Sequence, residues 1–222
     1  MVKKAFIFDM DGVIYDSEPI HAKAKKKVLA DVGIDVSDRR LATFVGRSSK
    51  DFYGTMVKEN PDCKVSWQEL AQRKHKLYKE MLTNDESVTL MPGLKALLER
   101  LRANGFAIGL GSSSTMEMIQ LVLERFELKK FFDVMVSGND LPRSKPDPLI
   151  FLTVAHELDV LPENCTVIDD ATAGVTAAKA AGMYCIGFYN PNSGPQDLSR
   201  ADRIVACHDE IDIHHCIERR LS

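Results

Sequence analysis

Short apolar runs alternate with longer amphipathic stretches along most of the chain. Six runs have the continuous apolar character of strands that are buried on both faces. They lie at residues 5–8, 106–110, 134–136, 166–168, 185–188 and 204–205. Helical patterns separate most of these runs, as in the stripe formed by Leu94, Leu97, Leu98 and Leu101. Strands that alternate with helices predict an α/β fold with a doubly wound parallel sheet.

The segment from residue 15 to residue 89 interrupts this alternation. It contains helical patterns and no convincing strand, and Ser66 opens one of its helices with a capping box that ends at Glu69. We therefore expect an α/β catalytic core formed by residues 1–14 and 90–222. We expect residues 15–89 to form an inserted α-helical cap that lies over the strand ends like a lid.

Composition and charge limit the classes of function. The chain has 222 residues, which suits a core with a smaller insert, and its net charge of -3 argues against a nucleic-acid partner. Its five cysteines are scattered and form no C-x-x-C pair, which favours free thiols in a reducing compartment. The first apolar run is too short for a signal peptide or a spanning helix. We expect a cytoplasmic protein with no membrane partner. The sequence does not define the oligomeric state, and a monomer is the default expectation.

Two carboxylates, Asp9 and Asp11, directly follow the first predicted strand. Residues i and i+2 of an extended segment point to the same side, so both carboxylates can face one small volume. Two like charges at that distance repel each other unless a cation joins them or one of them binds a proton. A solvated turn is an equally good interpretation of this pattern when it is taken alone.

Reactive side chains also follow three other predicted strands. Ser112 and Ser113 follow the second strand, Lys145 follows the third, and Asp169 and Asp170 follow the fourth. The run from Ser112 to Thr115 is typical of an anion pocket or of a helix N-cap, which at least one of its residues must be. The lysine is typical of a surface position or of a side chain held in place by the prolines that follow it.

The arrangement of the strands decides which of these residues meet. If the first and fourth strands are neighbours, Asp9, Asp11 and Asp170 converge at their carboxyl ends, where doubly wound sheets bind ligands. Three oxygen donors suit Mg²⁺, which keeps some of its waters and binds phosphate oxygens. Ser112 and Lys145 would then bind a phosphoryl group.

Together these motifs resemble those of the haloacid dehalogenase superfamily, in the branch of phosphatases that is similar to β-phosphoglucomutase. The matching motifs are Asp9-Met10-Asp11-Gly12-Val13, Ser112, Ser144-Lys145-Pro146-Asp147, and Asp169-Asp170 followed by Gly174. The resemblance implies a Rossmann-like core with a helical cap between the first and second motifs. It also implies a Mg²⁺-dependent phosphomonoester hydrolase that acts on a small sugar or other metabolite phosphate.

The resemblance further implies a role for each site residue. Asp9 would attack phosphorus and form an aspartyl-phosphate, and Asp11 would protonate the leaving oxygen and then take a proton from water. Lys145 would offset negative charge, and Ser112 with Ser113 would bind the phosphoryl oxygens. The implied metal ligands are Asp9, the backbone carbonyl of Asp11, and Asp170, with Asp169 as a further or outer ligand.

The cap departs from the family more than the core does. Ser49 stands where the sugar-phosphate mutases carry an arginine, which argues against mutase activity, although Arg47 lies nearby. Gly46 and Arg47 are the expected cap contacts to substrate. His21 is expected either to hydrogen-bond Asp11 or to be a partly buried structural histidine.

Other functions stay open at this point. A phosphosugar mutase of the β-phosphoglucomutase type would use the same first half-reaction. A phospho-accepting receiver-like signalling domain also combines an acidic cluster, a hydroxyl and a lysine, but such domains have no insert after the first strand. In the core, Ala171 replaces a serine that usually follows the fourth motif of the family.

Overall fold

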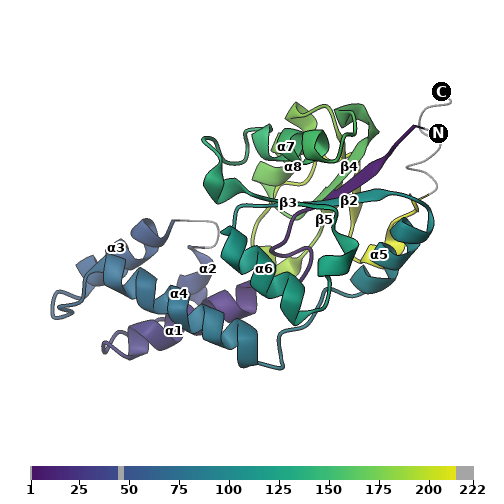
Figure 1. The fold of residues 1–222 in the computed structure, drawn as a ribbon. Coiled ribbons are helices and arrows are strands. Elements are labelled where there is room, and N and C mark those ends of the chain that lie inside the picture. Colours follow the sequence, from purple (N-terminus) through teal and green to yellow (C-terminus); the bar gives the residue numbers. More distant parts are fainter. Residues whose placement is uncertain (1, 45–47, 214–222) are drawn as a thin grey trace. The chain divides into compact units, whose positions relative to one another are not determined.

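The computed structural model describes residues 2–44 and 48–213 of the chain. Gly46 and Arg47, which the sequence singled out as cap contacts to substrate, lie outside the described residues. The chain divides into two compact units (Figure 1). One unit comprises residues 1–16, 89–191 and 195–222, and the other comprises residues 17–88 together with 192–194.

The first unit is built on one six-stranded sheet in which every strand pairing is parallel. The strands are β1 (Ala5–Phe8), β2 (Ala107–Ser112), β3 (Val134–Ser137), β4 (Cys165–Asp169), β5 (Tyr184–Phe188) and β6 (Arg203–Val205). Their order is β3-β2-β1-β4-β5-β6, so β1 pairs with β4 and Phe8 lies opposite Ile168. The predicted α/β fold class is confirmed, and so is the neighbourhood of the first and fourth strands. The strand order changes direction between β1 and β4, which is where such sheets bind ligands.

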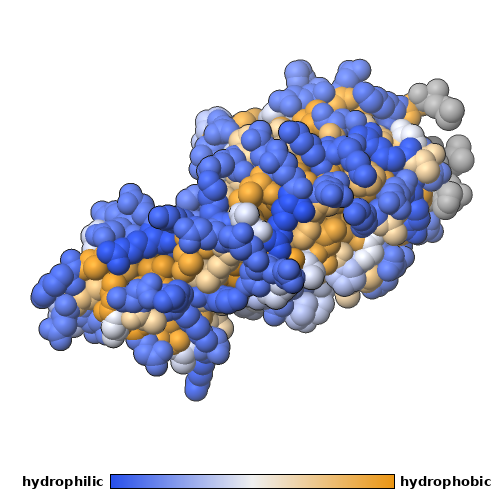
Figure 2. All heavy atoms as spheres, turned by 60° about the horizontal axis from the view of Figure 1, so that its bottom comes forward, coloured by the Kyte–Doolittle hydropathy of each residue, from blue (hydrophilic) through white to orange (hydrophobic). Residues whose placement is uncertain are grey.

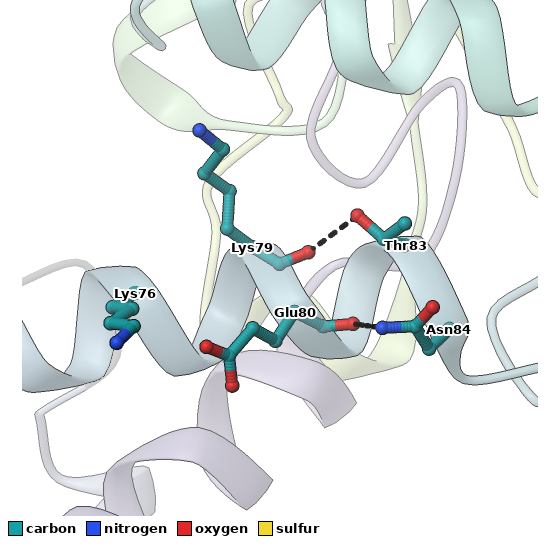
Figure 3. A pocket seen from close by; sticks show the side chains of 5 residues that line it. All are labelled: Lys76, Lys79, Glu80, Thr83 and Asn84. Atoms are coloured by element: carbon teal, nitrogen blue, oxygen red, sulfur yellow. Dashed lines mark hydrogen bonds between the residues drawn. The ribbon is translucent and has the colours of Figure 1, made fainter.

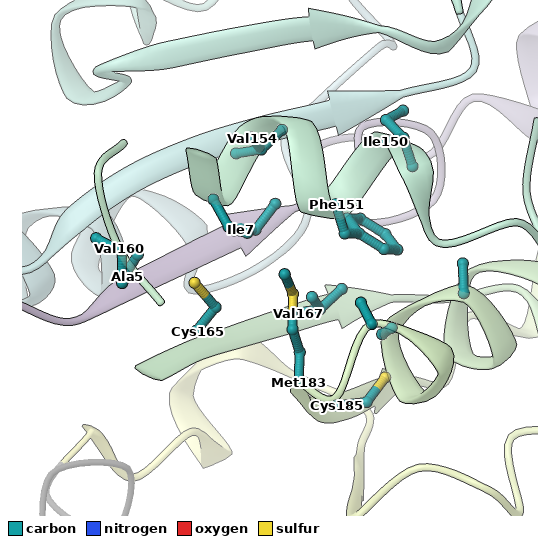
Figure 4. Packing of buried hydrophobic residues seen from close by; sticks show 14 of the residues in the cluster. Ala5, Ile7, Ile150, Phe151, Val154, Val160, Cys165, Val167, Met183 and Cys185 are labelled. Atoms are coloured by element: carbon teal, nitrogen blue, oxygen red, sulfur yellow. The ribbon is translucent and has the colours of Figure 1, made fainter. Parts of the chain in front are cut away.

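Helices cover both faces of this sheet (Figure 1). They are α5 (Leu94–Ala103), α6 (Met116–Arg125), α7 (Leu149–Glu157) and α8 (Thr172–Ala180), with short 3-10 turns at Lys129–Phe131, Gly138–Asp140, Pro162–Asn164, Pro191–Ser193 and His208–Glu210. Figure 4 shows part of the core under α7 and α8, where Ile7 of β1, Phe151 of α7 and Val167 of β4 pack together. Phe6 and Phe8 alternate with Ile7 along β1, so they point to the other face of the sheet.

Two segments of the α/β unit pair with each other where the chain leaves for the helical unit and where it returns. Tyr15 forms an antiparallel bridge with Leu90, and the backbone N–H of Met91 donates to the carbonyl of Ile14 at 2.9 Å. Both contacts lie inside the α/β unit.

The second unit is helical and has its own apolar core. Its helices are α1 (Glu18–Ala30), α2 (Asp38–Ala42), α3 (Ser49–Glu59) and α4 (Trp67–Asn84), and its described residues contain no strand. Leu29, Phe52, Tyr53 and Leu70 are fully buried in one cluster. The Ser66 hydroxyl accepts a hydrogen bond from the backbone N–H of Glu69 at 3.2 Å, so the predicted cap of this helix is confirmed.

The surface seen in Figure 2 is largely hydrophilic, with apolar patches between the polar side chains. Across residues 2–44 and 48–213, no helix has both the length and the apolar character that crossing a membrane requires. The cysteines of that part of the chain, Cys63, Cys165, Cys185 and Cys207, are all free thiols.

His208 is a buried histidine at the end of the α/β unit. Its ring lies 4.5 Å from the ring of Phe188, and its Nδ1 donates to the carbonyl of Pro92 at 3.1 Å. Its Nε2 is buried and has no hydrogen-bond partner within the described ranges. Burial lowers the pKa of His208 to about 4, although the bond to Pro92 and the carboxylate of Asp209 oppose this shift.

We therefore expect His208 to make the protein less stable in mild acid. Between pH 6.5 and about 4 the unfolded chain binds a proton at His208 that the folded chain excludes. The free energy of unfolding should fall by about 3 kcal/mol over this range, at about 1.4 kcal/mol for each pKa unit. Urea denaturation of the wild type and of His208→Gln as a function of pH measures this, because other groups such as His21 contribute equally to both curves. Two parallel curves would contradict the prediction.

Candidate functional site

Asp9 and Asp11 lie directly after β1, in a tight turn. The backbone N–H of Asp9 donates to the carbonyl of Ile168 at 2.9 Å, which continues the pairing of β1 with β4. Gly12 has a φ of 76°, a conformation that favours glycine, and its N–H donates to the carbonyl of Tyr15 at 2.9 Å. The strand pairing thus places Asp9, which is buried, and the turn places Asp11, which is partly exposed.

Lys145 joins two of the acidic residues. Its ammonium Nζ lies 2.5 Å from Oδ1 of Asp9 and 2.8 Å from Oδ2 of Asp169, and all three side chains are buried. The ammonium also lies 4.7 Å from the centre of the Phe151 ring. Burial by itself would lower the pKa of Lys145, but the carboxylates of Asp169 and Asp9 raise it above its ordinary value. Lys145 therefore stays protonated, and it is a fixed buried cation and not a surface lysine.

Both carboxyl oxygens of Asp169 have protein donors. Oδ2 accepts from Lys145, and Oδ1 accepts from the backbone N–H of Ala171 at 2.9 Å. The carboxyl group fits under α8 only because residue 174 is glycine: a Cβ atom there would lie 1.9 to 2.0 Å from the three carboxyl atoms of Asp169. Asp170, the next residue, is 7% exposed at the same strand end.

The pKa of Asp9 depends on its burial and on four neighbouring charged side chains. Burial raises the pKa of Asp9 well above its ordinary value, and the charges of Asp169, Asp170 and Asp11 raise it further, whereas Lys145 lowers it. At Asp9 the charge of one lysine thus opposes the charges of three carboxylates, and a cation would add to the effect of the lysine. The available donors are oxygen atoms, which are the ligands of Mg²⁺.

The described residues contain no group of three or more His, Cys, Asp or Glu side chains that could hold a metal ion by themselves. Mg²⁺ is commonly held by only one or two carboxylates, with waters and substrate phosphate completing its coordination. The side chains of Asp9 and Asp170, together with a backbone carbonyl, fit that mode of binding.

Ser112 ends β2 and is buried beside this site. Its hydroxyl oxygen accepts from the backbone N–H of Ser114 at 3.1 Å. The N-cap of α6 is Thr115, whose hydroxyl accepts from the N–H of Met118 at 3.4 Å. At least one residue of the run from Ser112 to Thr115 was expected to cap this helix, and Thr115 does so, whereas Ser112 does not. Ser113 is exposed in the same loop.

Sequence reasoning missed three hydroxyl residues at the site. Tyr15 and Ser114 donate to the carboxyl oxygens of Asp11, and Ser137 donates to the carbonyl of Ser114. The third serine of the run that begins at Ser112, and the tyrosine four residues after Asp11, were visible in the sequence. Their contacts depend on how the turn after Gly12 folds, which residue types and spacing do not specify.

His21 has its partners inside the helical unit. Its Nδ1 lies 2.8 Å from Nζ of Lys74, and its ring stacks on Tyr78 with 4.2 Å between centroids. Burial lowers the pKa of His21 well below its ordinary value, and Lys74 contributes to this shift. The expected contact of His21 with Asp11 stays a prediction.

A pocket on the surface of α4 contains none of the carboxylates that lie around Lys145. It is lined by Lys76, Lys79, Glu80, Thr83 and Asn84 (Figure 3). The side chains of Thr83 and Asn84 donate to the carbonyls of Lys79 and Glu80, so these polar groups stabilise the helix itself. No residue that the sequence predicted as part of a site lies there.

The chain is similar in sequence and in fold to known proteins. Residues 6–188 match the family described as haloacid dehalogenase-like hydrolase. The chain is 34% identical over 183 residues to hexitol phosphatase B of Escherichia coli K12, covering 82% of each chain. It is 35% identical over 188 residues to β-phosphoglucomutase of Bacillus subtilis strain 168, covering 83% of this chain and 82% of that one. A solved structure of a putative β-phosphoglucomutase from Thermotoga maritima superimposes with a TM-score of 0.82 and 28% identity, over 98% of this chain and all of the other.

Gly174→Ala tests how tightly Asp169 is enclosed. Alanine in a helix normally stabilises it relative to glycine by about 0.5–1 kcal/mol. Here the new Cβ would displace the Asp169 carboxyl group from Lys145, so we expect a loss of about 1–3 kcal/mol in the free energy of unfolding, as for other overpacked cores. Gly54→Ala in α3 is the matched control, because a Cβ there meets no atom within 4 Å. Urea denaturation should give changes of opposite sign, and equal changes would contradict the enclosure of Asp169.

Proposed function

The chain belongs to the haloacid dehalogenase-like hydrolase family, and on that premise we propose that it is a Mg²⁺-dependent phosphomonoester hydrolase for a small sugar, polyol or other metabolite phosphate. The observation that carries this proposal is the buried Lys145 bridge between Asp9 and Asp169 at the carboxyl ends of β1 and β4. A lysine held against a carboxylate in this position supports attack by that carboxylate on an anionic phosphate ester. The relatives named above support the substrate class by their names, hexitol phosphatase and β-phosphoglucomutase.

Asp9 is the proposed nucleophile. One of its carboxyl oxygens forms a bond to phosphorus while the bond from phosphorus to the ester oxygen breaks, which leaves an aspartyl-phosphate. Asp11 gives a proton to the departing ester oxygen. Water then bonds to phosphorus and loses a proton to Asp11, the bond between Asp9 and phosphorus breaks, and inorganic phosphate leaves.

Positive charge lets two anions approach each other in this buried site. Lys145 is the fixed source, since it is protonated and hydrogen-bonded to the attacking residue. Mg²⁺, when bound, supplies further positive charge to the phosphoryl oxygens. Asp9, the backbone carbonyl of Asp11, and Asp170 would hold it. We assign Asp169 to the positioning of Lys145, because both of its oxygens already accept from protein donors.

The loop after β2 is the proposed phosphoryl-binding element. The Ser112 oxygen accepts from Ser114, and a hydroxyl that accepts in this way keeps its own hydrogen for donation to a phosphoryl oxygen. Ser113 adds a second hydroxyl in the same loop. We place the contacts that select the rest of the substrate in the helical cap, with His21, Gly46 and Arg47 as candidates.

Asp9→Asn should abolish phosphate release without unfolding the protein. An amide is a poor nucleophile, so turnover of sugar phosphates and of p-nitrophenyl phosphate should fall to the background rate. Asp140→Asn, at an exposed position, should keep wild-type activity. Phosphate release and the circular dichroism of both variants measure this.

The same assay tests whether activity requires Mg²⁺ and whether the protein is an enzyme or a signalling domain. Excess chelator should stop phosphate release by the wild type, and added Mg²⁺ should restore it, whereas Mg²⁺ should not rescue Asp9→Asn. Multiple turnover would exclude a phospho-accepting signalling domain. Wild-type rates in Asp9→Asn would mean that the mechanism is wrong.

A phosphosugar mutase is the second candidate, favoured by the similarity to β-phosphoglucomutase. A mutase returns the phosphoryl group to a sugar before water removes it from Asp9. Incubation with β-glucose 1-phosphate and a bisphosphate primer separates the two activities. We expect free phosphate to appear rapidly. Glucose 6-phosphate without free phosphate would instead show a mutase.

A further inference from the structure

The carboxyl group of Asp11 is held at both oxygens by hydroxyl groups from two different segments. The hydroxyl of Tyr15 donates to Oδ1 at 3.2 Å, and the hydroxyl of Ser114 donates to Oδ2 at 3.0 Å. An aspartate side chain otherwise rotates about two bonds. Two donors that approach from different segments select one orientation of this carboxyl group.

Tyr15 is itself fixed by the turn that follows β1. Its carbonyl accepts from the N–H of Gly12 at 2.9 Å, and its backbone bridges to Leu90. Its side chain is fully buried, and its ring lies 6.2 Å from the ring of Phe126. The tyrosine hydroxyl is therefore presented to Asp11 from a rigid position.

Ser114 is fixed on both sides of its backbone. Its N–H donates to the hydroxyl of Ser112 at 3.1 Å, and its carbonyl accepts from the hydroxyl of Ser137 at 3.0 Å. Ser137 is 3% exposed and lies opposite Ser112 in the pairing of β2 with β3. Hydrogen bonds to the backbone and from the side chain of Ser114 thus link Ser137, at the end of β3, to Asp11 after β1.

We propose that Tyr15 and Ser114 are positioning residues that orient Asp11 for proton transfer, and that Ser137 supports Ser114 in this role. The inference rests on the proposed function, because it takes Asp11 as the proton carrier. In the first half-reaction the ester oxygen leaves phosphorus and takes a proton from Asp11. A proton reaches that oxygen only if the Asp11 carboxyl group lies within hydrogen-bond distance of it. A small misplacement of a reacting group can cost as much as 10²-fold in rate.

Two substrates with different leaving groups distinguish a loss of Asp11 orientation from general damage to the site. An alkyl phosphate releases a strongly basic alkoxide that needs the proton, whereas p-nitrophenyl phosphate releases a stable phenolate that hardly needs it. The value of kcat/KM includes only the steps through the departure of the leaving group, so the comparison does not depend on the later attack by water. The alkyl substrate is the sugar or polyol phosphate that the wild type turns over fastest in a panel.

Ser114→Ala and Tyr15→Phe should each lower the ratio of kcat/KM for the alkyl phosphate to kcat/KM for p-nitrophenyl phosphate by about ten-fold or more. Ser114→Thr keeps the hydroxyl and should preserve the ratio within about two-fold. Ser199→Ala and Tyr189→Phe, both at exposed positions of the α/β unit, remove the same chemical groups and should leave both substrates unaffected.

An equal loss on both substrates in Ser114→Ala would assign Ser114 a structural role and overturn the proposal. An unchanged ratio, or a faster reaction of the alkyl phosphate, would overturn it as well, since the second result would mean that the hydroxyls hold Asp11 in an unproductive orientation. If Tyr15→Phe does not fold, the comparison of Ser114→Ala with Ser114→Thr decides. A wild type that releases phosphate from neither substrate would overturn the proposed function itself, which is a different result from any change in the ratio.

Discussion

The contact between Lys145 and the carboxylates of Asp9 and Asp169 is the interaction on which the site depends. It joins the ends of β1 and β4 to the loop after β3, and its three charged side chains are buried. Removing Lys145 would take the cation away from two buried carboxylates, and breaking a buried ion pair in this way typically costs about 3–5 kcal/mol. The contact requires β1 beside β4 and a glycine at position 174. The site therefore depends both on the pairing of β1 with β4 and on the close packing of α8 against Asp169.

Asp9 lies among charges of both signs. Asp169 accepts from Lys145 and from a backbone N–H, whereas Asp9 contacts the same lysine and also faces the charges of Asp170 and Asp11. These carboxylates raise the pKa of Asp9 at the place where we propose that an anionic substrate binds. A bound cation would reduce the repulsion between these carboxylates and an anionic substrate, and the oxygen donors at the strand ends are suited to one.

Much of the fold followed from the sequence, because buried parallel strands appear as continuous apolar runs. All six predicted runs are strands, with bounds that shift by at most two residues at each end. The expectation that Asp9, Asp11 and Asp170 lie near one another followed from the rule that parallel strands bring their carboxyl ends to one edge of a sheet, and their roles stay predictions. The partners of Asp169 and Asp11 were not found. They depend on the path of single turns, and the serine run at Ser112 gave no sign of which hydroxyl caps the helix and which one contacts Asp11.

The pairing of Tyr15 with Leu90 has a consequence for how the fold accommodates its insert. The chain leaves the α/β unit and returns to it at two adjacent positions that are hydrogen-bonded to each other. Joining ends that are already close adds little entropic cost as the intervening segment lengthens, about 0.6 kcal/mol for each doubling of its length. The helical unit also has its own apolar core. The inserted segment can therefore lengthen, shorten or be exchanged during evolution while the sheet keeps its pairing.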